Sequence, residues 1–172
     1  MSLLVAAREA SKLTNQLLSF ERAGGTDVAQ AGEVLDFKEL VVRVVDTFRI
    51  QNSTKDIEVL VDAPDAAIHI RDDSVMLQEA ILNLLTKSVV HGGPKMSKIM
   101  LCMTCLEDKA KLLIKDNGVE IPPNKHIAAS SRFGQANGSL GSGLGLPIAA
   151  RVVKNHGGSL EIIASTGGAC IL

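Results

Sequence analysis

From residue 34 onward, the hydrophobic residues of this chain alternate between the spacing typical of helices and that typical of strands. This alternation constrains the fold more than any other feature of the sequence. Helices and strands that follow one another in this way pack in layers around one core. The chain has 172 residues, about the length of one domain with a short appendage. We therefore predict a compact α/β domain over residues 34–172.

Three helices are predicted in this domain. The first begins after Asp36, which with Glu39 matches a capping box. Its apolar face is formed by Phe37, Leu40, Val41, Val44, Val45 and Phe48. The second runs from Asp72-Asp73-Ser74 to about His91, and the third from about Pro147 to His156. Strands are predicted at 57–61, 66–70, 98–106, 110–115, 159–163 and 169–172, with 34–37 as a short strand or a helix start.

The N-terminal residues predict a separate helix. Between residues 3 and 22 the apolar positions are three and four apart in turn, at Leu3, Ala6, Ala10, Leu13, Leu17 and Phe20. This heptad spacing favours pairing with a second chain, and packing on its own domain is the alternative. Gly24-Gly25 ends the helix, so residues 1–25 form this segment and residues 26–33 a linker.

Composition excludes several classes of partner. The chain carries 18 Lys and Arg against 19 Asp and Glu, without the excess of positive charge that a general nucleic-acid binder needs. Only 2% of residues are aromatic, too few for a base-stacking platform. No apolar run approaches the roughly 18 residues that cross a bilayer, and the start lacks the features of a signal peptide. We expect a cytoplasmic chain that meets a membrane only through another part of a longer protein.

Cys102 and Cys105 form a single CxxC, which is typical of a redox pair or half a zinc site. Residues three apart on a strand point to opposite faces, and no second CxxC completes a metal site. We therefore favour buried free thiols for these cysteines and for Cys170.

A glycine-rich segment before the third predicted helix indicates a phosphate site. Gly141-Ser142-Gly143-Leu144-Gly145-Leu146 lets the backbone approach an anion beside a helix N-terminus, although a plain turn is the alternative. The segment is neither the dinucleotide GxGxxG nor a P-loop. It closes a long irregular stretch over 117–143, and such loops are usually functional.

Two further features contribute polar groups. Asp116 ends a predicted strand beside Asn117-Gly118, where its carboxylate can accept a hydrogen bond from an exocyclic amine such as that of adenine; a turn signal is the alternative. On the second predicted helix a polar stripe recurs every four residues, at Glu79, Asn83, Lys87 and His91, and a solvated face is the alternative.

In chain order these features are a helix with Leu-Asn-Leu-Leu, a strand ending in Asp-x-Gly, a glycine-rich segment, and Gly-x-Gly-Leu-Gly-Leu before a helix ending in His-Gly-Gly. Over about residues 34–172 this order resembles the ATP-binding catalytic domain of sensor histidine kinases, of the gyrase, Hsp90, histidine kinase and MutL ATPase superfamily. The resemblance implies a two-layer α/β sandwich with a mixed sheet of about five strands and three helices on one face. Residues 10–18 resemble the second helix of that family's dimerisation domain.

The resemblance also implies an ATP site. Asp116 would bind the adenine amine, Gly118 would leave room for the ring, and Ile121 would contact the base. Asn83 matches the first Asn of the family's N-box helix, and Arg132-Phe133 resembles the end of its phenylalanine box. Residues 135–139 resemble a short ATP lid. The remaining positions assigned to the nucleotide are Lys87, His91, Gly141, Gly143, Leu144, Gly145 and Leu146.

Several positions depart from the family pattern. Lys87 stands where the family has its second N-box Asn, a magnesium ligand, so only Asn83 remains as a metal ligand. Val90 replaces a phosphate-binding Lys, and Glu120 replaces the second Gly of the DxGxG motif, adding bulk and charge. The first Phe of the phenylalanine box is missing near Ala128-Ala129. One interpretation is that Lys87 itself neutralises phosphate oxygens in place of Mg²⁺; the other is decay towards a pseudokinase.

The family's phosphoacceptor His is absent, because His69, His91, His126 and His156 all lack its sequence context. We therefore expect the catalytic region of a sensor histidine kinase that donates the ATP γ-phosphate to a His outside this chain. Its partners would be a second kinase chain, paired through the N-terminal helix, and a response regulator. The alternatives are a non-catalytic docking module on the same fold and a serine kinase of the anti-sigma-factor type.

Overall fold

The computed structural model describes residues 33–53, 56–107, 109–122, 145–155, 157–163, 165 and 167–171. The predicted N-terminal helix and linker lie outside these residues, as does most of the glycine-rich stretch. Within the described part, no helix is both long enough and apolar enough to span a membrane.

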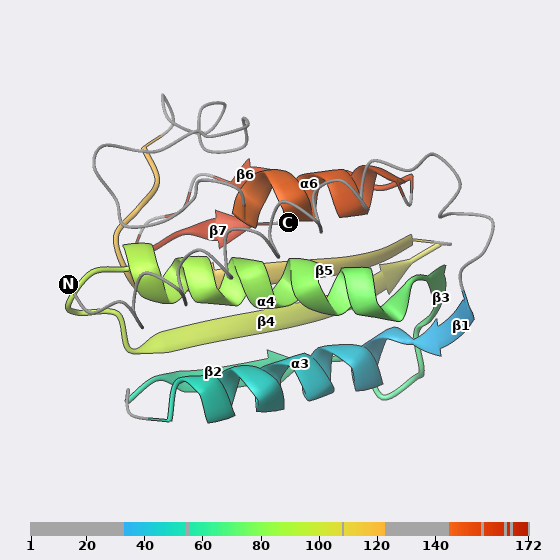
Figure 1. Cartoon of the computed structure of the whole chain (residues 1–172), viewed down its shortest axis with the longest axis horizontal. Coiled ribbons are helices and arrows are strands. Elements are labelled where there is room, and N and C mark those ends of the chain that lie inside the picture. Colours follow the sequence, from blue (N-terminus) through green and yellow to red (C-terminus); the bar gives the residue numbers. More distant parts are fainter. Residues whose placement is uncertain are drawn as a thin grey trace, which may run out of the picture.

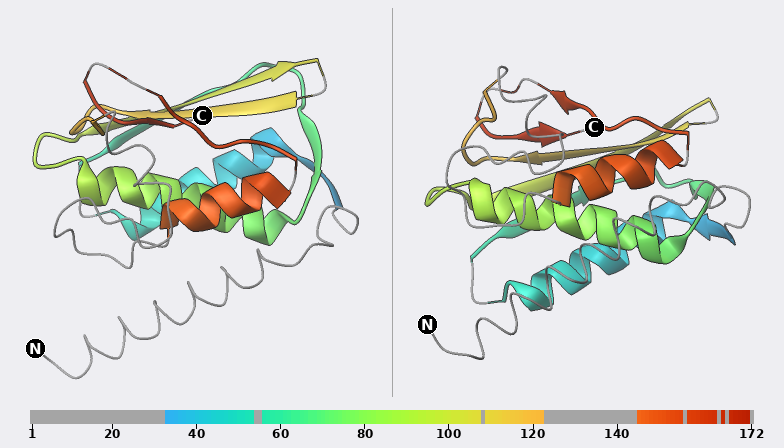
Figure 2. Two further views of the ribbon diagram at one scale, coloured as in Figure 1. Left: turned by 90° about the horizontal axis from the view of Figure 1, so that it is seen from above. Right: turned by 45° about the horizontal axis from the view of Figure 1, so that its top comes forward.

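The domain is a sandwich of one main sheet and one layer of helices (Figures 1 and 2). The sheet has the order β2-β4-β5-β7-β6, with β2 parallel to β4 and the other neighbours antiparallel. Its strands are β2 (Glu58–Asp62), β4 (Lys98–Leu106), β5 (Lys109–Asp116), β6 (Ile162–Ile163) and β7 (Cys170–Ile171). The helices are α3 (Phe37–Gln51), α4 (Ser74–His91) and α6 (Gly145–Asn155), and all three cover the same face. The predicted two-layer fold with a mixed five-stranded sheet is therefore confirmed.

A second, two-stranded sheet joins β1 (Glu33–Asp36) to β3 (His69–Asp72). The sequence predicted a strand at 66–70 next to the strand at 57–61, but β3 begins three residues later and pairs with β1 instead. The chain between β2 and β3 is held against the start of α3. Phe37 N donates to the Ile68 carbonyl at 2.8 Å, and Lys38 Nζ donates to the Pro64 carbonyl at 3.0 Å. These bonds carry the chain away from the main sheet.

Both predicted acidic helix starts are confirmed. The Asp36 carboxylate accepts hydrogen bonds from the backbone N–H groups of Lys38 and Glu39, at 2.8 and 3.4 Å. The Asp73 carboxylate accepts from Val75 and Met76, at 2.9 and 3.1 Å. Each carboxylate thus satisfies two amides that a helix leaves without an internal partner.

The third helix, α6, begins at Gly145, two residues before the predicted start. Pro147 is then its third residue. A proline is tolerated there because the first-turn N–H groups have no partner within the helix. The last glycine of the GSGLGL segment is consequently part of the helix.

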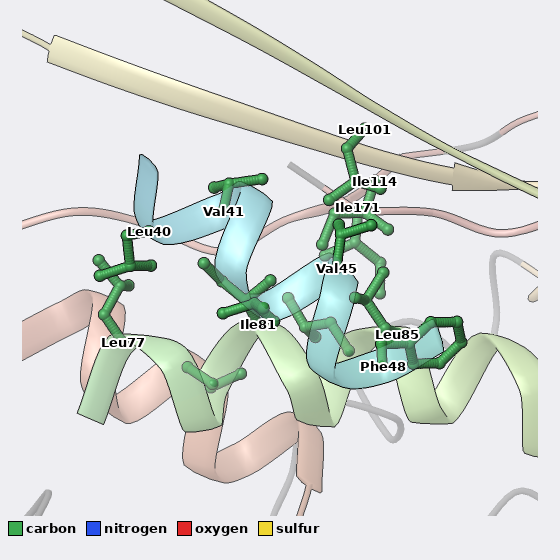
Figure 3. Close-up of a cluster of buried hydrophobic side chains, with 14 of the residues drawn as sticks. Leu40, Val41, Val45, Phe48, Leu77, Ile81, Leu85, Leu101, Ile114 and Ile171 are labelled. Carbon is green, nitrogen blue, oxygen red and sulfur yellow. The ribbon is translucent and has the colours of Figure 1, made fainter. Parts of the chain in front are cut away.

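One hydrophobic core lies between the helices and the sheet. The predicted apolar face of α3 is buried at all six positions, and the packing face of α4 is buried at Ala80, Ile81, Leu84, Leu85 and Ser88. Figure 3 shows Val45 and Leu85 gathered beneath Leu101, Ile114 and Ile171 of the sheet. α6 closes the layer with Ile148, Ala149 and Val152. This core fixes the positions of the ends of α4 and β5, where the predicted nucleotide-binding residues lie.

The prediction of buried cysteines is correct for Cys170 and wrong for Cys105, while Cys102 is half-buried. The last three residues of β4 are exposed, so the strand continues past the helix layer and carries Cys105 with it. All three thiols are free. Burial and the Asp62 carboxylate, which accepts a hydrogen bond from the Cys102 thiol at 3.9 Å, raise the pKa of Cys102.

Two adjacent glycines before β7 allow a sharp test of how β7 packs against the end of β5. Gly168 has a φ of +127°, and a Cβ there would overlap the backbone carbonyl of Asp116, whereas a Cβ at Gly167, with a φ of +86°, meets open space. We expect Gly168→Ala to lower the free energy of unfolding by more than about 2 kcal/mol, because backbone must move. Gly167→Ala should cost only about 1 kcal/mol of backbone strain.

Urea unfolding of the two variants beside the unsubstituted chain measures this difference. Equal losses at both positions would contradict the packing of β7 against the end of β5.

Candidate nucleotide-binding site

Asp116 is a buried carboxylate at the end of β5, with only 3% of its surface exposed. Its Oδ1 accepts two backbone hydrogen bonds, from Gly118 N at 2.9 Å and from Ala169 N at 3.1 Å. Among the described residues, no hydrogen bond reaches Oδ2. One oxygen therefore holds the surrounding backbone, and the other is the acceptor that a ligand can use.

The residues around Asp116 form more than a simple turn. Asp116 N donates to the Ala169 carbonyl at 3.0 Å. The neighbouring Asn117 side chain accepts from the backbone N–H groups of Ser97 and Lys98, both at 3.0 Å. The start of β4 and the start of β7 are thus both tied to this segment, which fixes the orientation of the Asp116 carboxylate.

Gly118 lies directly against the end of α4. A Cβ at this position would overlap the backbone of Gly92, and Val119 N donates to the Gly92 carbonyl at 3.0 Å. The resemblance implied that Gly118 makes room for the adenine ring. The structure adds a second requirement for glycine, because any side chain would push α4 away from the end of β5.

The Glu120 carboxylate is directed to the turn before β7. Its Oε1 accepts a hydrogen bond from Gly167 N at 2.7 Å, and the residue is exposed. The extra charge at this departure from the family pattern is therefore engaged by a backbone N–H, and the segment after Asp116 gains one more tie to the β6–β7 turn.

The polar stripe of α4 is not a simple solvated face. Glu79, Asn83 and Lys87 are half-buried and only His91 is exposed. Asn83 Nδ2 is buried and has no hydrogen-bond partner among the described residues. The first residue of α6 covers this part of the stripe, since a Cβ added to Gly145 would lie 2.9 Å from Lys87 Cε and 3.8 Å from Asn83 Cβ. The alternative of a purely solvated stripe is wrong for these three residues.

The stripe carries one positive charge next to a neutral imidazole. Partial burial and then the Lys87 ammonium lower the pKa of His91, although much of the residue remains exposed. His91 is therefore uncharged at neutral pH, and Lys87 supplies the positive charge beside Asn83. A single ammonium next to a free amide donor suits an anion.

Lys87 and Asn83 by themselves offer Mg²⁺ a single amide oxygen. That ion takes oxygen ligands in near-octahedral geometry. Among the residues described, no group of three or more His, Cys, Asp or Glu side chains could hold a metal ion. Lys87 lies one helical turn from Asn83 and repels a dication. The stripe also carries the Glu79 carboxylate, one turn before Asn83 and two turns before Lys87.

The structure thus describes some of the predicted site residues and not others. It places Asn83, Lys87 and Gly145 together, and Asp116 beside Gly118. Leu146 is buried in the core at the start of α6. Ile121 is half-buried after the end of β5. The predicted residues that lie outside the described part are Phe133, Gly141, Gly143 and Leu144.

Sequence reasoning missed Gly92, Gly168 and Ala169 as parts of the site. Gly92 directly follows the predicted end of the second helix, and Ala169 was predicted only as the first residue of a strand. The available signal was two pairs of adjacent glycines in the sequence, Gly92-Gly93 after α4 and Gly167-Gly168 before β7. Such pairs indicate close backbone approach, but their contacts with Gly118 and Asp116 are distant in sequence.

Comparison with known proteins identifies the family of this domain. Residues 72–172 match the family described as histidine kinase-, DNA gyrase B-, and HSP90-like ATPase. The chain is 23% identical over 169 residues to the sensor-like histidine kinase SenX3 of Mycobacterium tuberculosis, covering 95% of this chain and 41% of the relative. It is 29% identical to the signal transduction histidine-protein kinase/phosphatase MprB of Mycobacterium avium, covering 92% of this chain and 30% of the relative. The chain therefore spans less than half the length of these relatives.

A solved structure of the mycobacterial sensor histidine kinase MprB superposes with a TM-score of 0.70 at 30% identity, covering 82% of this chain and 94% of that one. The two proteins thus match in both fold and sequence over most of the domain. The resemblance drawn from the sequence is confirmed: this chain belongs to the histidine kinase-, DNA gyrase B-, and HSP90-like ATPase family, and its relatives include sensor histidine kinases.

Proposed function

We propose that this chain is the ATP-binding catalytic region of a two-component sensor histidine kinase, which donates the ATP γ-phosphate to a histidine outside this chain. The observation that carries the proposal is the difference between the two carboxylate oxygens of Asp116. Backbone N–H groups hold Oδ1, and Oδ2 has no partner in the described part of the chain. Family membership supplies the class of ligand.

In this proposal the chain positions the nucleotide at two places. Oδ2 of Asp116 accepts a hydrogen bond from the exocyclic amine of adenine, which selects adenine over bases with a carbonyl at that position. Asn83, Lys87 and the N-terminus of α6 lie at the polyphosphate end. Catalysis then comes from holding the γ-phosphate in line with its acceptor and from neutralising its charge.

The proposed partners follow from the same family. The heptad pattern at residues 3–20 would pair with a second kinase chain, and a response regulator would take the phosphate from the acceptor histidine. The relatives are sensor kinases more than twice as long as this chain. We therefore place it in the cytoplasmic portion of such a sensor.

A non-catalytic docking module on the same fold is the second candidate. Val90 favours it, because this side chain stands where the family has a phosphate-binding Lys and is 47% exposed, so no cation occupies that position. A nucleotide-binding measurement separates the two candidates, since the module requires no ATP site.

The variant Asp116→Asn tests the adenine contact directly. Its amide oxygen can still accept the backbone bonds from Gly118 and Ala169, while its NH₂ group replaces the acceptor Oδ2. We expect ATP affinity to fall by about 10- to 100-fold, the range for a lost hydrogen bond to a charged group. Calorimetric titration with ATP measures the loss, and ITP, with a carbonyl in place of the amine, should lose less than ATP.

The charge-matched control is Asp65→Asn, at an exposed carboxylate in the loop between β2 and β3. It should leave ATP affinity unchanged, and circular dichroism should show both variants folded. Unchanged ATP binding in Asp116→Asn would refute the adenine site, and absence of ATP binding by the unsubstituted chain would favour the docking module.

We also expect this chain by itself to gain no acid-labile phosphate from γ-labelled ATP. The reason is that none of its four histidines lies in the family's acceptor context. Labelled ATP, gel electrophoresis and acid treatment measure the result, with His91→Gln as the variant of interest because His91 is exposed near Lys87. Acid-labile label that disappears in His91→Gln would contradict the assignment of an acceptor outside the chain.

A further inference from the structure

We propose that Lys87 and Asn83 form a polyphosphate subsite in which the Lys87 ammonium replaces a divalent cation, so that the chain binds ATP without Mg²⁺. The proposal rests on the proposed function, because it concerns the phosphate end of the same nucleotide. It concerns a different property, which is whether ATP needs Mg²⁺ in order to bind.

The position of Lys87 is set by the contact between α4 and α6. The first residue of α6 is a glycine, and a Cβ on Gly145 would come within 2.9 Å of Lys87 Cε. The stem of Lys87 therefore occupies the space that a side chain at residue 145 would need. Lys87 is half-buried there, at the helix end where backbone N–H groups have no internal partner and the dipole is positive.

Asn83 supplies an independent observation at the same place. Its Nδ2 is buried and finds no acceptor among the described residues, and its Cβ lies 3.8 Å from the Cβ position of residue 145. An amide N–H₂ group donates two hydrogen bonds and accepts none, so a phosphate oxygen satisfies it and a metal ion does not. Lys87 and Asn83 are one turn apart on α4, which places charge and donor side by side.

The surrounding charges favour the same ligand. His91, the next residue of the stripe, is neutral because burial and the Lys87 ammonium both lower its pKa. Glu79 opposes an anion, and because it lies one turn before Asn83 but two turns before Lys87, its carboxylate does so less strongly at Lys87. A dication bound to the phosphates next to Lys87 would face an ammonium at close range in a partly desolvated site, where the repulsion is poorly screened. Lys87 and Mg²⁺ therefore compete for the same phosphate oxygens.

The test compares calorimetric titrations of the chain with ATP in EDTA and in excess Mg²⁺. We expect the two dissociation constants to agree within about threefold, because Lys87 already neutralises the phosphates. Affinity more than about tenfold weaker in EDTA would overturn the inference while leaving the ATP site intact. Absence of binding in both conditions would overturn the inference together with the proposed function.

For the variant Lys87→Asn we expect ATP affinity to depend on Mg²⁺. The substitution removes the ammonium and offers a second amide oxygen one turn from Asn83, so ATP affinity in EDTA should fall by about 10- to 100-fold and Mg²⁺ should recover a large part of the loss. Lys154→Asn, at an exposed lysine of α6, should change neither value. Unchanged affinity of Lys87→Asn in EDTA would overturn the inference.

Two further measurements separate a phosphate contact from a structural role. AMP has the adenine but no polyphosphate, so its affinity should be the same for Lys87→Asn and the unsubstituted chain. Asn83→Asp exchanges the amide donor for a carboxylate, which binds cations and repels phosphate, and it should weaken ATP binding in EDTA. Equal loss of AMP and ATP in Lys87→Asn would overturn the subsite and indicate a structural role for Lys87.

Discussion

The close approach of three backbone segments, with no side chain between them, is the constraint on which the rest of this structure depends. The end of α4 meets the segment after β5 at Gly92 and Gly118, and the turn before β7 meets the end of β5 at Gly168 and Asp116. Backbone bonds of 3.0 Å close both contacts. Because these contacts leave no room for a Cβ, the segment that carries the Asp116 carboxylate is held in one position by two distant parts of the chain, the end of α4 and the turn before β7.

The local part of this fold could be predicted from sequence. The apolar face of α3 and the caps at Asp36 and Asp73 depend on residues within one or two helical turns, and the structure reproduces them. The pairing of β3 with β1 could not be predicted, because it depends on hydrogen bonds to the start of α3 across about 30 residues. β6 and β7 have two residues each, too few for a hydrophobic pattern to define their ends.

The candidate site could likewise be predicted only in part from the sequence. The spacing of four along α4 indicated the stripe that contains Asn83 and Lys87, and the strand-end position indicated Asp116. The burial of the stripe follows only from the position of α6, whose first residue packs on it. The roles of Gly92 and Gly168 are likewise properties of contacts between segments. Sequence reasoning thus identified the chemical groups, and the packing of helices determined which of them are shielded from water.

The main sheet also presents little unpaired backbone to another molecule. On one side it ends in β6, with two residues. On the other side it ends in β2, where the Arg49 guanidinium donates to the Val59 carbonyl at 2.8 Å and acidic residues stand at both ends of the strand. Short, charged and occupied edges of this kind oppose strand-to-strand aggregation. In the described part of the chain, association through sheet extension is therefore disfavoured, and the fold can remain separate from its neighbours at high local concentration.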